Sequence, residues 1–169
     1  AYQRGGFIPY FAGDAFTAVF PVKLDRSHAI HLLHTAKLTR GIFQKRGNKF
    51  GDGYTIGVKA GLAAGGISYG IVGEDLRAFY FRGNDIDQAA YCQMQANDQD
   101  IVIDEVMHSL LEDQIILAEE VAQGAYLVAG DISNAVDDVD YPPLKLAVID
   151  PEIATTFLPP EVVRYDQAG

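Results

Sequence analysis

Apolar and aromatic residues near the start of the chain form two short runs, residues 7–11 and 15–20, separated by Ala12-Gly13-Asp14. Glycine adopts positive φ easily and aspartate caps a turn, so this pattern predicts a β-hairpin. A helix is predicted next, because Asp25 and Ser27 offer N-caps and Lys45, Arg46 and Gly47 are typical of a helix C-terminus. Its apolar positions recur at helical spacing: Ala29, Leu32, Leu33, Ala36 and Phe43.

The remaining hydrophobic pattern predicts alternating strands and helices. Residues 54–63 and 66–73, separated by Ala64-Gly65, predict a second hairpin, and the aromatic run 77–82 predicts a further strand. Helical spacing predicts helices over residues 85–96 and 105–111, with a strand over 100–104 between them. Later strands are expected near residues 114–118, 125–129 and 144–149. This order indicates an α+β sheet covered by helices on one face.

Composition and length indicate one globular domain. The chain has 169 residues, 49% hydrophobic and 21% charged, which is enough apolar surface for a core. Proline is concentrated late, at Pro142, Pro143, Pro151, Pro159 and Pro160. We therefore expect the domain to occupy residues 1–130 and a C-terminal extension or linker to occupy residues 131–169.

Charge and cysteine content narrow the partners and the compartment. The net charge of −10 argues against nucleic acid, whose phosphates need a basic footprint. A single cysteine, Cys92, excludes an internal disulfide and indicates a cytoplasmic protein. No apolar run reaches the roughly 20 residues of a membrane span, and no signal peptide is seen.

Asp14 is the first candidate for chemistry. It lies at the expected hairpin tip, within Phe11-Ala12-Gly13-Asp14-Ala15-Phe16, where a carboxylate can point into a cleft and hold a hard cation such as Mg²⁺ or Mn²⁺. Taken alone, a turn aspartate more often caps its own backbone.

Three blocks in order resemble class III adenylate/guanylate cyclase catalytic domains. They are the Phe-Ala-Gly-Asp-Ala-Phe hairpin, the Gly-rich run 58–73 and the Gly83-Asn84-Asp85-Ile86-Asp87 segment that opens a helix. The resemblance covers about residues 5 to 111 and is nearest to the first cyclase domain of tandem, soluble-adenylyl-cyclase-like proteins. It implies a ferredoxin-like cyclase fold with a mostly antiparallel sheet. The family's first strand, which carries another metal-binding aspartate, would precede Ala1.

The resemblance implies a role for each matched position. Asp14 would be one of two metal-binding aspartates, in a reaction that converts ATP (or GTP) to the cyclic monophosphate and pyrophosphate. The two purine-selecting positions fall at Tyr10 and Ala78, and Arg77 could contact a phosphate. The Asn and Arg that orient the ribose and stabilise the transition state fall at Asp87 and Tyr91, so the expected active site is degenerate.

These departures leave three hypotheses. The first is the metal-binding half of a pseudo-heterodimer with a second cyclase domain, because a homodimer would lack the transition-state groups. The second is an inactive pseudo-cyclase that regulates an active domain. The third is an unrelated α+β domain in which Asp14 merely caps a turn.

Other clusters favour structural explanations. His28, His31 and His34 indicate a partly solvated helix face rather than a metal site, and the aspartates near residues 131–140 a solvated loop. The glycines between residues 65 and 73 lack the Gly-Lys-Ser/Thr of a P-loop and indicate tight packing. Cys92 is expected to be a buried, inert thiol.

Overall fold

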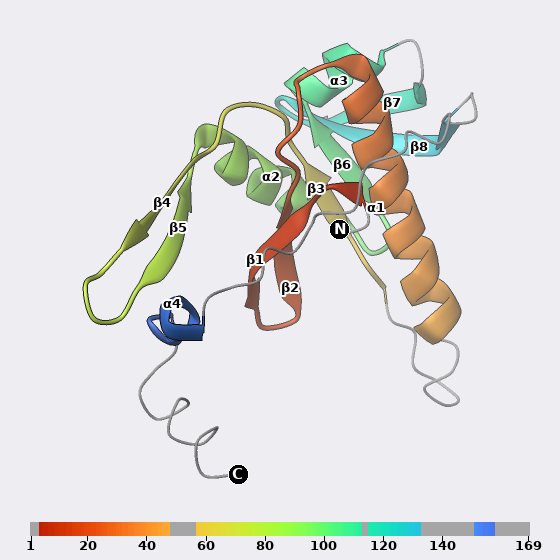
Figure 1. Ribbon diagram of the computed structural model, residues 1–169. Helices are drawn as coiled ribbons and strands as arrows, with labels where there is room; N and C mark the ends of the chain where they lie inside the picture. The colour runs from red at the N-terminus through yellow and green to blue at the C-terminus, as the bar shows by residue number, and fades with distance from the viewer. Residues whose placement is uncertain (1–3, 48–56, 113–114, 133–150, 158–169) are drawn as a thin grey trace.

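The computed structural model describes residues 4–47, 57–112, 115–132 and 151–157 (Figure 1). Residues 144–149, where a strand was predicted, lie outside these ranges. The described strands are β1 (Phe7–Ala12), β2 (Ala15–Val19), β3 (Ala60–Leu62), β4 (Ser68–Val72), β5 (Ala78–Arg82), β6 (Ile101–Asp104), β7 (Ile115–Ala122) and β8 (Ala125–Ile132). The described helices are α1 (Arg26–Gly47), α2 (Asn84–Gln95), α3 (Glu105–Leu111) and α4 (Pro151–Thr155).

The first hairpin forms as predicted. Strands β1 and β2 pair antiparallel, and the pair Ala12–Ala15 closes the turn. Gly13 has φ +64° in that turn, the left-handed conformation that glycine adopts without strain. The local sequence therefore determines both the position of the turn and the residues at its tip.

Helix α1 also begins and ends where the sequence predicted. Oδ1 of Asp25 accepts the His28 backbone N–H at 3.0 Å and lies 2.7 Å from the His28 ring, so Asp25 is the N-cap, whereas Ser27 lies inside the helix. His31 is buried, although a partly solvated histidine face was expected. Phe43 stays exposed, since the last turns of α1 run past the four-stranded sheet (Figure 1).

The second predicted hairpin is wrong in its partners. β3 pairs in parallel with β6, and β4 pairs antiparallel with β5 instead. The larger sheet has the order β3-β6-β8-β7, with β6-β8 and β7-β8 antiparallel. Gly61 explains how β3 is held, because a Cβ there would collide with the α2 backbone at Ala89 and Gln93. Helix α2 therefore packs closely on β3.

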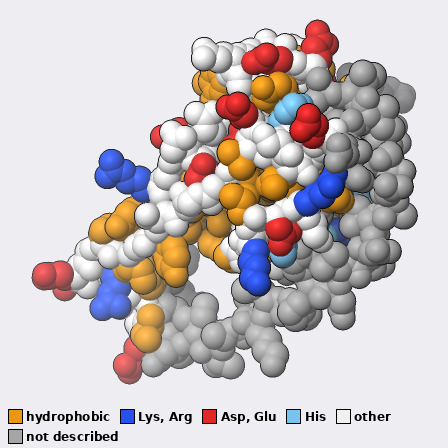
Figure 2. Space-filling view, turned by 90° about the horizontal axis from the view of Figure 1, so that it is seen from above, with side chains coloured by type: hydrophobic (Ala, Val, Ile, Leu, Met, Phe, Trp, Pro, Cys, Tyr) orange, Lys and Arg blue, Asp and Glu red, His pale blue; other side chains and the backbone are white. Residues whose placement is uncertain are grey.

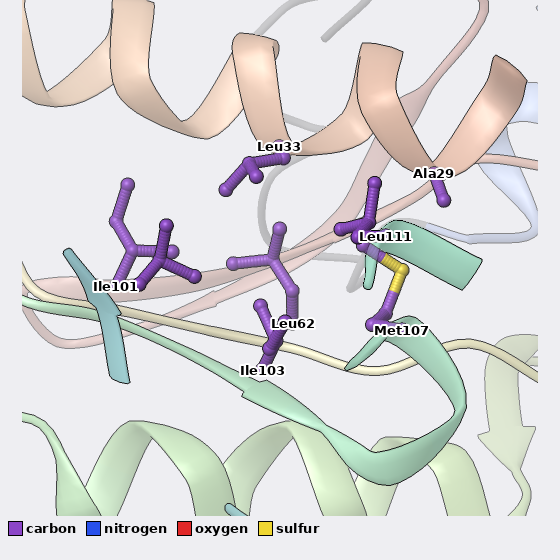
Figure 3. Close-up of a cluster of buried hydrophobic side chains, with 8 residues drawn as sticks. Ala29, Leu33, Leu62, Ile101, Ile103, Met107 and Leu111 are labelled. Carbon is purple, nitrogen blue, oxygen red and sulfur yellow. The ribbon is translucent and has the colours of Figure 1, made fainter. Parts of the chain in front are cut away.

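Strand β6 carries the core of the molecule. Its four residues are all buried: Ile101 and Ile103 lie in a cluster with α1 and α3, and Val102 lies in a second cluster with α2. Figure 3 shows the first cluster, with α1 along one side and α2 across β6 on the other. The α+β class and the mostly antiparallel pairing are confirmed. The helices, however, divide between the two faces, because β6 presents buried apolar side chains in both directions.

Strands β4 and β5 form a separate two-stranded ribbon that extends away from the larger sheet (Figure 1). Its register runs from Ser68–Arg82 at the base to Val72–Ala78 near the turn. Phe7 of β1 meets Phe81 at the base, with ring centroids 5.8 Å apart. The ribbon is thus fixed at one end and projects at the other.

Candidate nucleotide and metal site

Asp14 lies at a well-defined tip. The rings of Phe11 and Phe16 face each other across the hairpin with centroids 5.9 Å apart, next to the turn that holds Asp14. Asp14 itself is exposed, and among the described residues no hydrogen bond or ion pair engages its carboxylate. The hairpin therefore presents an accessible anionic ligand from a position that pairing on both sides restrains.

Tyr10 lies on the same hairpin, opposite Thr17. The Thr17 hydroxyl donates to the Tyr10 hydroxyl at 3.4 Å, and the Tyr10 side chain remains 48% exposed. A phenol in this place can stack on a flat ring or donate one hydrogen bond, but it carries no positive charge for a phosphate.

The two positions on α2 differ in their surroundings. Asp87 is exposed, whereas Tyr91, one turn later, is half-buried and packs against the cluster of Cys92, Ala96, Val102 and Ala125. Positions i and i+4 share a helix face, so both residues border the same surface. Tyr91 already contributes to the core, and neither side chain supplies the cation that a transferred phosphoryl group needs.

Arg77 and Ala78 lie at the far end of the β4–β5 ribbon, near its turn. The Arg77 backbone N–H donates to the Thr156 carbonyl at 2.6 Å, and both Arg77 and Ala78 are exposed. The predicted positions thus occupy three separate elements: the β1–β2 hairpin, helix α2 and the ribbon (Figure 1). Each element carries one pair of these positions: Asp14 and Tyr10 on the hairpin, Asp87 and Tyr91 on the helix, and Arg77 and Ala78 on the ribbon.

The fit to a divalent cation is incomplete in this chain. Mg²⁺ and Mn²⁺ prefer several oxygen ligands, and Asp14 supplies one carboxylate. Among the residues that the structure describes, no three His, Cys, Asp or Glu side chains gather as a metal site. Asp14 can therefore be one ligand of a site whose other ligands come from elsewhere.

A hollow of about 160 Å³ lies between β2, β3 and the first turns of α1 and α2. Its apolar lining includes Leu32, Leu62 and Met107, and its polar lining includes His28 and Asp85. Sequence reasoning missed this place, and none of the six predicted site residues lines it. Asp85 lies against Gly65, where any Cβ would collide with its carboxylate. The tight turn expected of this Gly-rich run is confirmed at Gly73, which has φ +97° and where a Cβ would collide with the Leu76 carbonyl.

Asp104, which sequence reasoning also missed as a special residue, is a buried carboxylate at the end of β6. Its Oδ1 accepts the Met107 N–H at 2.8 Å, and its Oδ2 accepts the Ala64 N–H at 3.3 Å. Burial raises the pKa of Asp104 above its ordinary 3.8, against the two N–H donors, and the charge of Asp85 adds to the rise. Asp104 caps α3 and links it to the loop after β3. An Asp between a predicted strand and a predicted helix was the sequence signal for this capping role.

Comparison with solved structures places the fold. The adenylyl cyclase CyaB of P. aeruginosa superposes with a TM-score of 0.62 at 17% identity, covering 79% of this chain and 76% of that one. The guanylate cyclase domain of RhGC from Catenaria anguillulae, in complex with GTP, gives 0.56 at 16% identity over 74% and 71%. A dimeric guanylyl cyclase domain of RhoGC from Blastocladiella emersonii gives 0.56 at 17% identity over 76% and 74%.

The chain therefore has the fold of class III adenylyl and guanylyl cyclase catalytic domains. No protein-family profile and no curated protein sequence matches it. In the described ranges, no helix is long and apolar enough to cross a bilayer.

Proposed function

We propose that this chain is a nucleotidyl cyclase domain that contributes the Asp14 carboxylate to an active site shared with a second cyclase domain. The observation that carries the proposal is the exposed Asp14 on a restrained hairpin within a cyclase fold. The chain would act as the first of two tandem domains in the cytoplasm, with residues 131–169 as the extension that leads onward.

The proposed reaction converts ATP, or GTP, to the 3′,5′-cyclic monophosphate. The ribose 3′-oxygen forms a bond to the α-phosphorus, the bond from that phosphorus to the bridging oxygen breaks, and pyrophosphate leaves while the hydroxyl proton passes to solvent. A divalent cation held in part by Asp14 would acidify the 3′-hydroxyl and offset the triphosphate charge. The role left to this chain's own residues is to hold the Asp14 carboxylate at a restrained hairpin tip and to place Tyr10 beside the nucleotide.

The substitutions on α2 decide what this chain cannot do alone. A positioned donor to the transition state is worth roughly 10²–10³ in rate, and a phosphoryl-stabilising arginine roughly 10³–10⁵. Asp87 and Tyr91 provide neither group. A homodimer is therefore expected to be close to inactive, and the partner domain would supply the base-selecting, Asn and Arg groups.

A regulatory pseudo-cyclase is the second candidate, and the packing of Tyr91 into the core favours it. In this case the domain pairs with an active cyclase domain and binds a nucleotide or a small anion without turnover. The same fold and the same losses on α2 are required, so the two functions separate only at Asp14.

Metal-dependent nucleotide binding tests the proposed role of Asp14. Mn²⁺ with a non-hydrolysable ATP analogue should raise the melting temperature of the chain, extended N-terminally so that a second metal ligand can be present, by a few degrees, because a ligand that binds only the native state stabilises it. Asp14→Asn should abolish the rise, and Asp75→Asn, at another exposed turn, should leave it intact. A chain whose melting temperature does not respond to this pair of ligands is not a metal–nucleotide binding domain.

Complementation separates the half-site from regulation. Cyclic nucleotide formation is measured for the chain, extended N-terminally as above, with and without a second cyclase domain that retains its Asn and Arg. Activity that appears only in the mixture and is lost with Asp14→Ala supports the half-site. Activity that survives Asp14→Ala supports the regulatory domain.

A further inference from the structure

The β4–β5 ribbon joins the rest of the chain through two connections that contain glycine. Gly66 lies just before β4 and Gly83 directly after β5. A Cβ at Gly66 would meet no atom within 4 Å, so that connection has open space around it. Among the described elements, β4 and β5 form a sheet only with each other, and an isolated two-stranded hairpin is marginally stable in water. The ribbon is therefore an arm with a flexible base, whose position depends on contacts along its length.

The first of these contacts lies at the base of the ribbon. Side chains alternate along a strand, so Tyr69, Phe79 and Phe81 lie on one face. The Phe7 ring of β1 packs on Phe81 with centroids 5.8 Å apart, and Phe81 stacks on Phe79 at 6.1 Å with planes at 14°. Figure 2 shows hydrophobic side chains gathered along this projecting part of the molecule. Strand β1 thus supports the ribbon at one end of its aromatic face.

The second contact lies at the outer end of the ribbon, where α4 is found (Figure 1). The Phe157 ring, just after α4, stacks on Phe79 with centroids 5.7 Å apart and planes at 20°. The Thr156 carbonyl accepts the Arg77 backbone N–H at 2.6 Å. A row of four rings, Phe7, Phe81, Phe79 and Phe157, therefore runs from β1 to the segment after α4. Phe79 remains 56% exposed, so the outer contact can break without opening the core.

This outer contact involves a candidate site residue directly. Arg77 lies just before β5, and its backbone N–H is held by Thr156 while its side chain is exposed. Residues 151–157 therefore restrain the Arg77 backbone and leave the guanidinium at the surface. A group that is held in place before its ligand arrives loses less conformational entropy on binding.

We propose that residues 151–157 are a latch for the outer end of the ribbon, and that Phe157 is a positioning residue for Arg77. With the latch docked, the ribbon is supported at both ends of its aromatic face. With the latch released, only Phe7 supports it and the ribbon turns about its glycine base. The latch follows from these contacts alone, whereas the positioning of Arg77 for a nucleotide phosphate rests on the proposed function.

Amide hydrogen exchange of the full chain, followed by mass spectrometry without nucleotide or metal, tests the latch. Phe157→Ala removes one ring pair and should speed exchange in residues 68–82 roughly 2- to 10-fold. Replacing residues 151–157 with seven Gly and Ser residues also removes the hydrogen bond and should speed it roughly 5- to 100-fold. Phe157→Tyr keeps a flat ring and should preserve the original rate.

Two controls separate the latch from a general loss of stability. Ile153→Ala, at an exposed position of α4, should leave exchange in the ribbon unchanged. Exchange in β6 and β8 should stay the same in every variant. Three results overturn the latch: ribbon exchange that Phe157→Ala does not alter, an equal rise in β6 and β8, or a Phe157→Tyr chain that behaves like Phe157→Ala.

The melting-temperature experiment with Mn²⁺ and the ATP analogue, in the N-terminally extended chain, tests the positioning of Arg77. Phe157→Ala should raise the nucleotide concentration for half of the maximal rise roughly 2- to 10-fold, because apparent affinity falls with the fraction of chains that hold Arg77 in place. Arg77→Ala should weaken binding while it keeps the backbone N–H that Thr156 accepts. Adding Phe157→Ala to Arg77→Ala should then have no further effect, since the latch acts through the missing guanidinium.

The outcomes distinguish the latch from the proposed function. An original chain with no rise in melting temperature overturns the nucleotide site and the positioning role together, and hydrogen exchange still decides the latch. A rise that is the same in the original chain and in Phe157→Ala overturns the positioning role and leaves the nucleotide site intact. An equal effect of Phe157→Ala with and without Arg77 also overturns the positioning role.

Discussion

At the scale of single residues, Asp104 combines a local helix cap with burial and a long-range hydrogen bond that no local pattern could specify. Its carboxylate caps α3 through Met107 and reaches the loop after β3 through Ala64, forty residues earlier in the chain. The sequence around it indicates a strand and a helix, but the burial arises only when three elements meet. The capping role of Asp104 could therefore be predicted from the sequence, whereas its burial could not.

The raised pKa of Asp104 predicts a specific pH dependence of stability. A carboxyl with a folded-state pKa above its unfolded value of 3.8 favours the folded state most when protonated, and this contribution is lost as the pH rises through the folded pKa. The stability of the original chain relative to Asp104→Asn should therefore increase as the pH falls from 7 towards 4. Urea unfolding followed by circular dichroism at several pH values measures this difference.

Two further variants test the assignment at Asp104. Asp75→Asn, at the exposed ribbon tip, removes a carboxylate without burial and should not reproduce the pH dependence. Asp104→Ala should lower the free energy of unfolding by about 1–3 kcal/mol at neutral pH, because it removes a cap and leaves the Met107 N–H without its acceptor. A pH-independent difference between Asp104→Asn and the original chain would contradict the raised pKa.

At the scale of elements, the sequence predicted which helices and strands form better than it predicted which strands pair. The β1–β2 hairpin and the helices α1, α2 and α3 follow from turn residues, caps and periodicity, all of which are local. The pairing of β3 with β6 does not, because a parallel pair needs a long crossover and the paired residues, such as Ala60 and Ile101, are 41 positions apart. The two apolar runs on either side of Gly65 have the sequence pattern of a hairpin. The packing of α2 on Gly61, which the sequence does not reveal, accompanies a different pairing.

The candidate site shows the same division. The turn singles out Asp14, but its metal-binding role and the candidacy of Tyr10 on the same hairpin rested on a resemblance. The positions Ala78, Asp87 and Tyr91 also rested on a resemblance. They lie on the ribbon and on α2, and the spacing of residues in the sequence does not predict how these two elements are arranged in space. The prediction of a buried thiol is confirmed, because Cys92 is a free, buried cysteine. Its position on the apolar side of a predicted helix was enough to predict this burial.

The close approach of α2 to β3 predicts an unequal response of two glycines to alanine. Gly61→Ala places a methyl group against the α2 backbone and should lower the free energy of unfolding by about 1–3 kcal/mol, because backbone cannot move aside as a side chain can. A methyl group at Gly41, inside α1, would meet no atom within 4 Å beyond its own helix backbone and chain neighbours. Gly41→Ala should raise stability by about 0.5–1 kcal/mol through helix propensity. Chemical denaturation measures both, and equal effects would contradict the packing described.

At the scale of the whole molecule, β6 joins two cores that share no side chain. Ile103 packs towards α1 and α3, and Val102 packs towards α2. Because one strand belongs to both cores, neither can lose its packing while the other remains intact. The domain should therefore unfold as one cooperative unit.

Neighbouring substitutions on opposite faces of β6 test this cooperativity. Ile103→Ala should lower the free energy of unfolding by about 2–5 kcal/mol, and Val102→Ala by about 1.5–3 kcal/mol. In both variants, circular dichroism and tyrosine fluorescence should report the same unfolding midpoint. Midpoints that separate in one variant would show that the two faces of the sheet are independent.

The burial of Cys92 makes its rate of labelling a measure of local opening of the fold. It is the only cysteine in the chain, it is fully buried on α2, and burial raises its pKa to about 11. A thiol reagent can reach it only while α2 is lifted from the sheet, and at neutral pH little thiolate exists even then. The rate at which the chain takes up one label therefore times the opening of α2, the helix that carries Asp87 and Tyr91. Any ligand that holds this helix against the sheet will slow that rate, whatever chemistry follows.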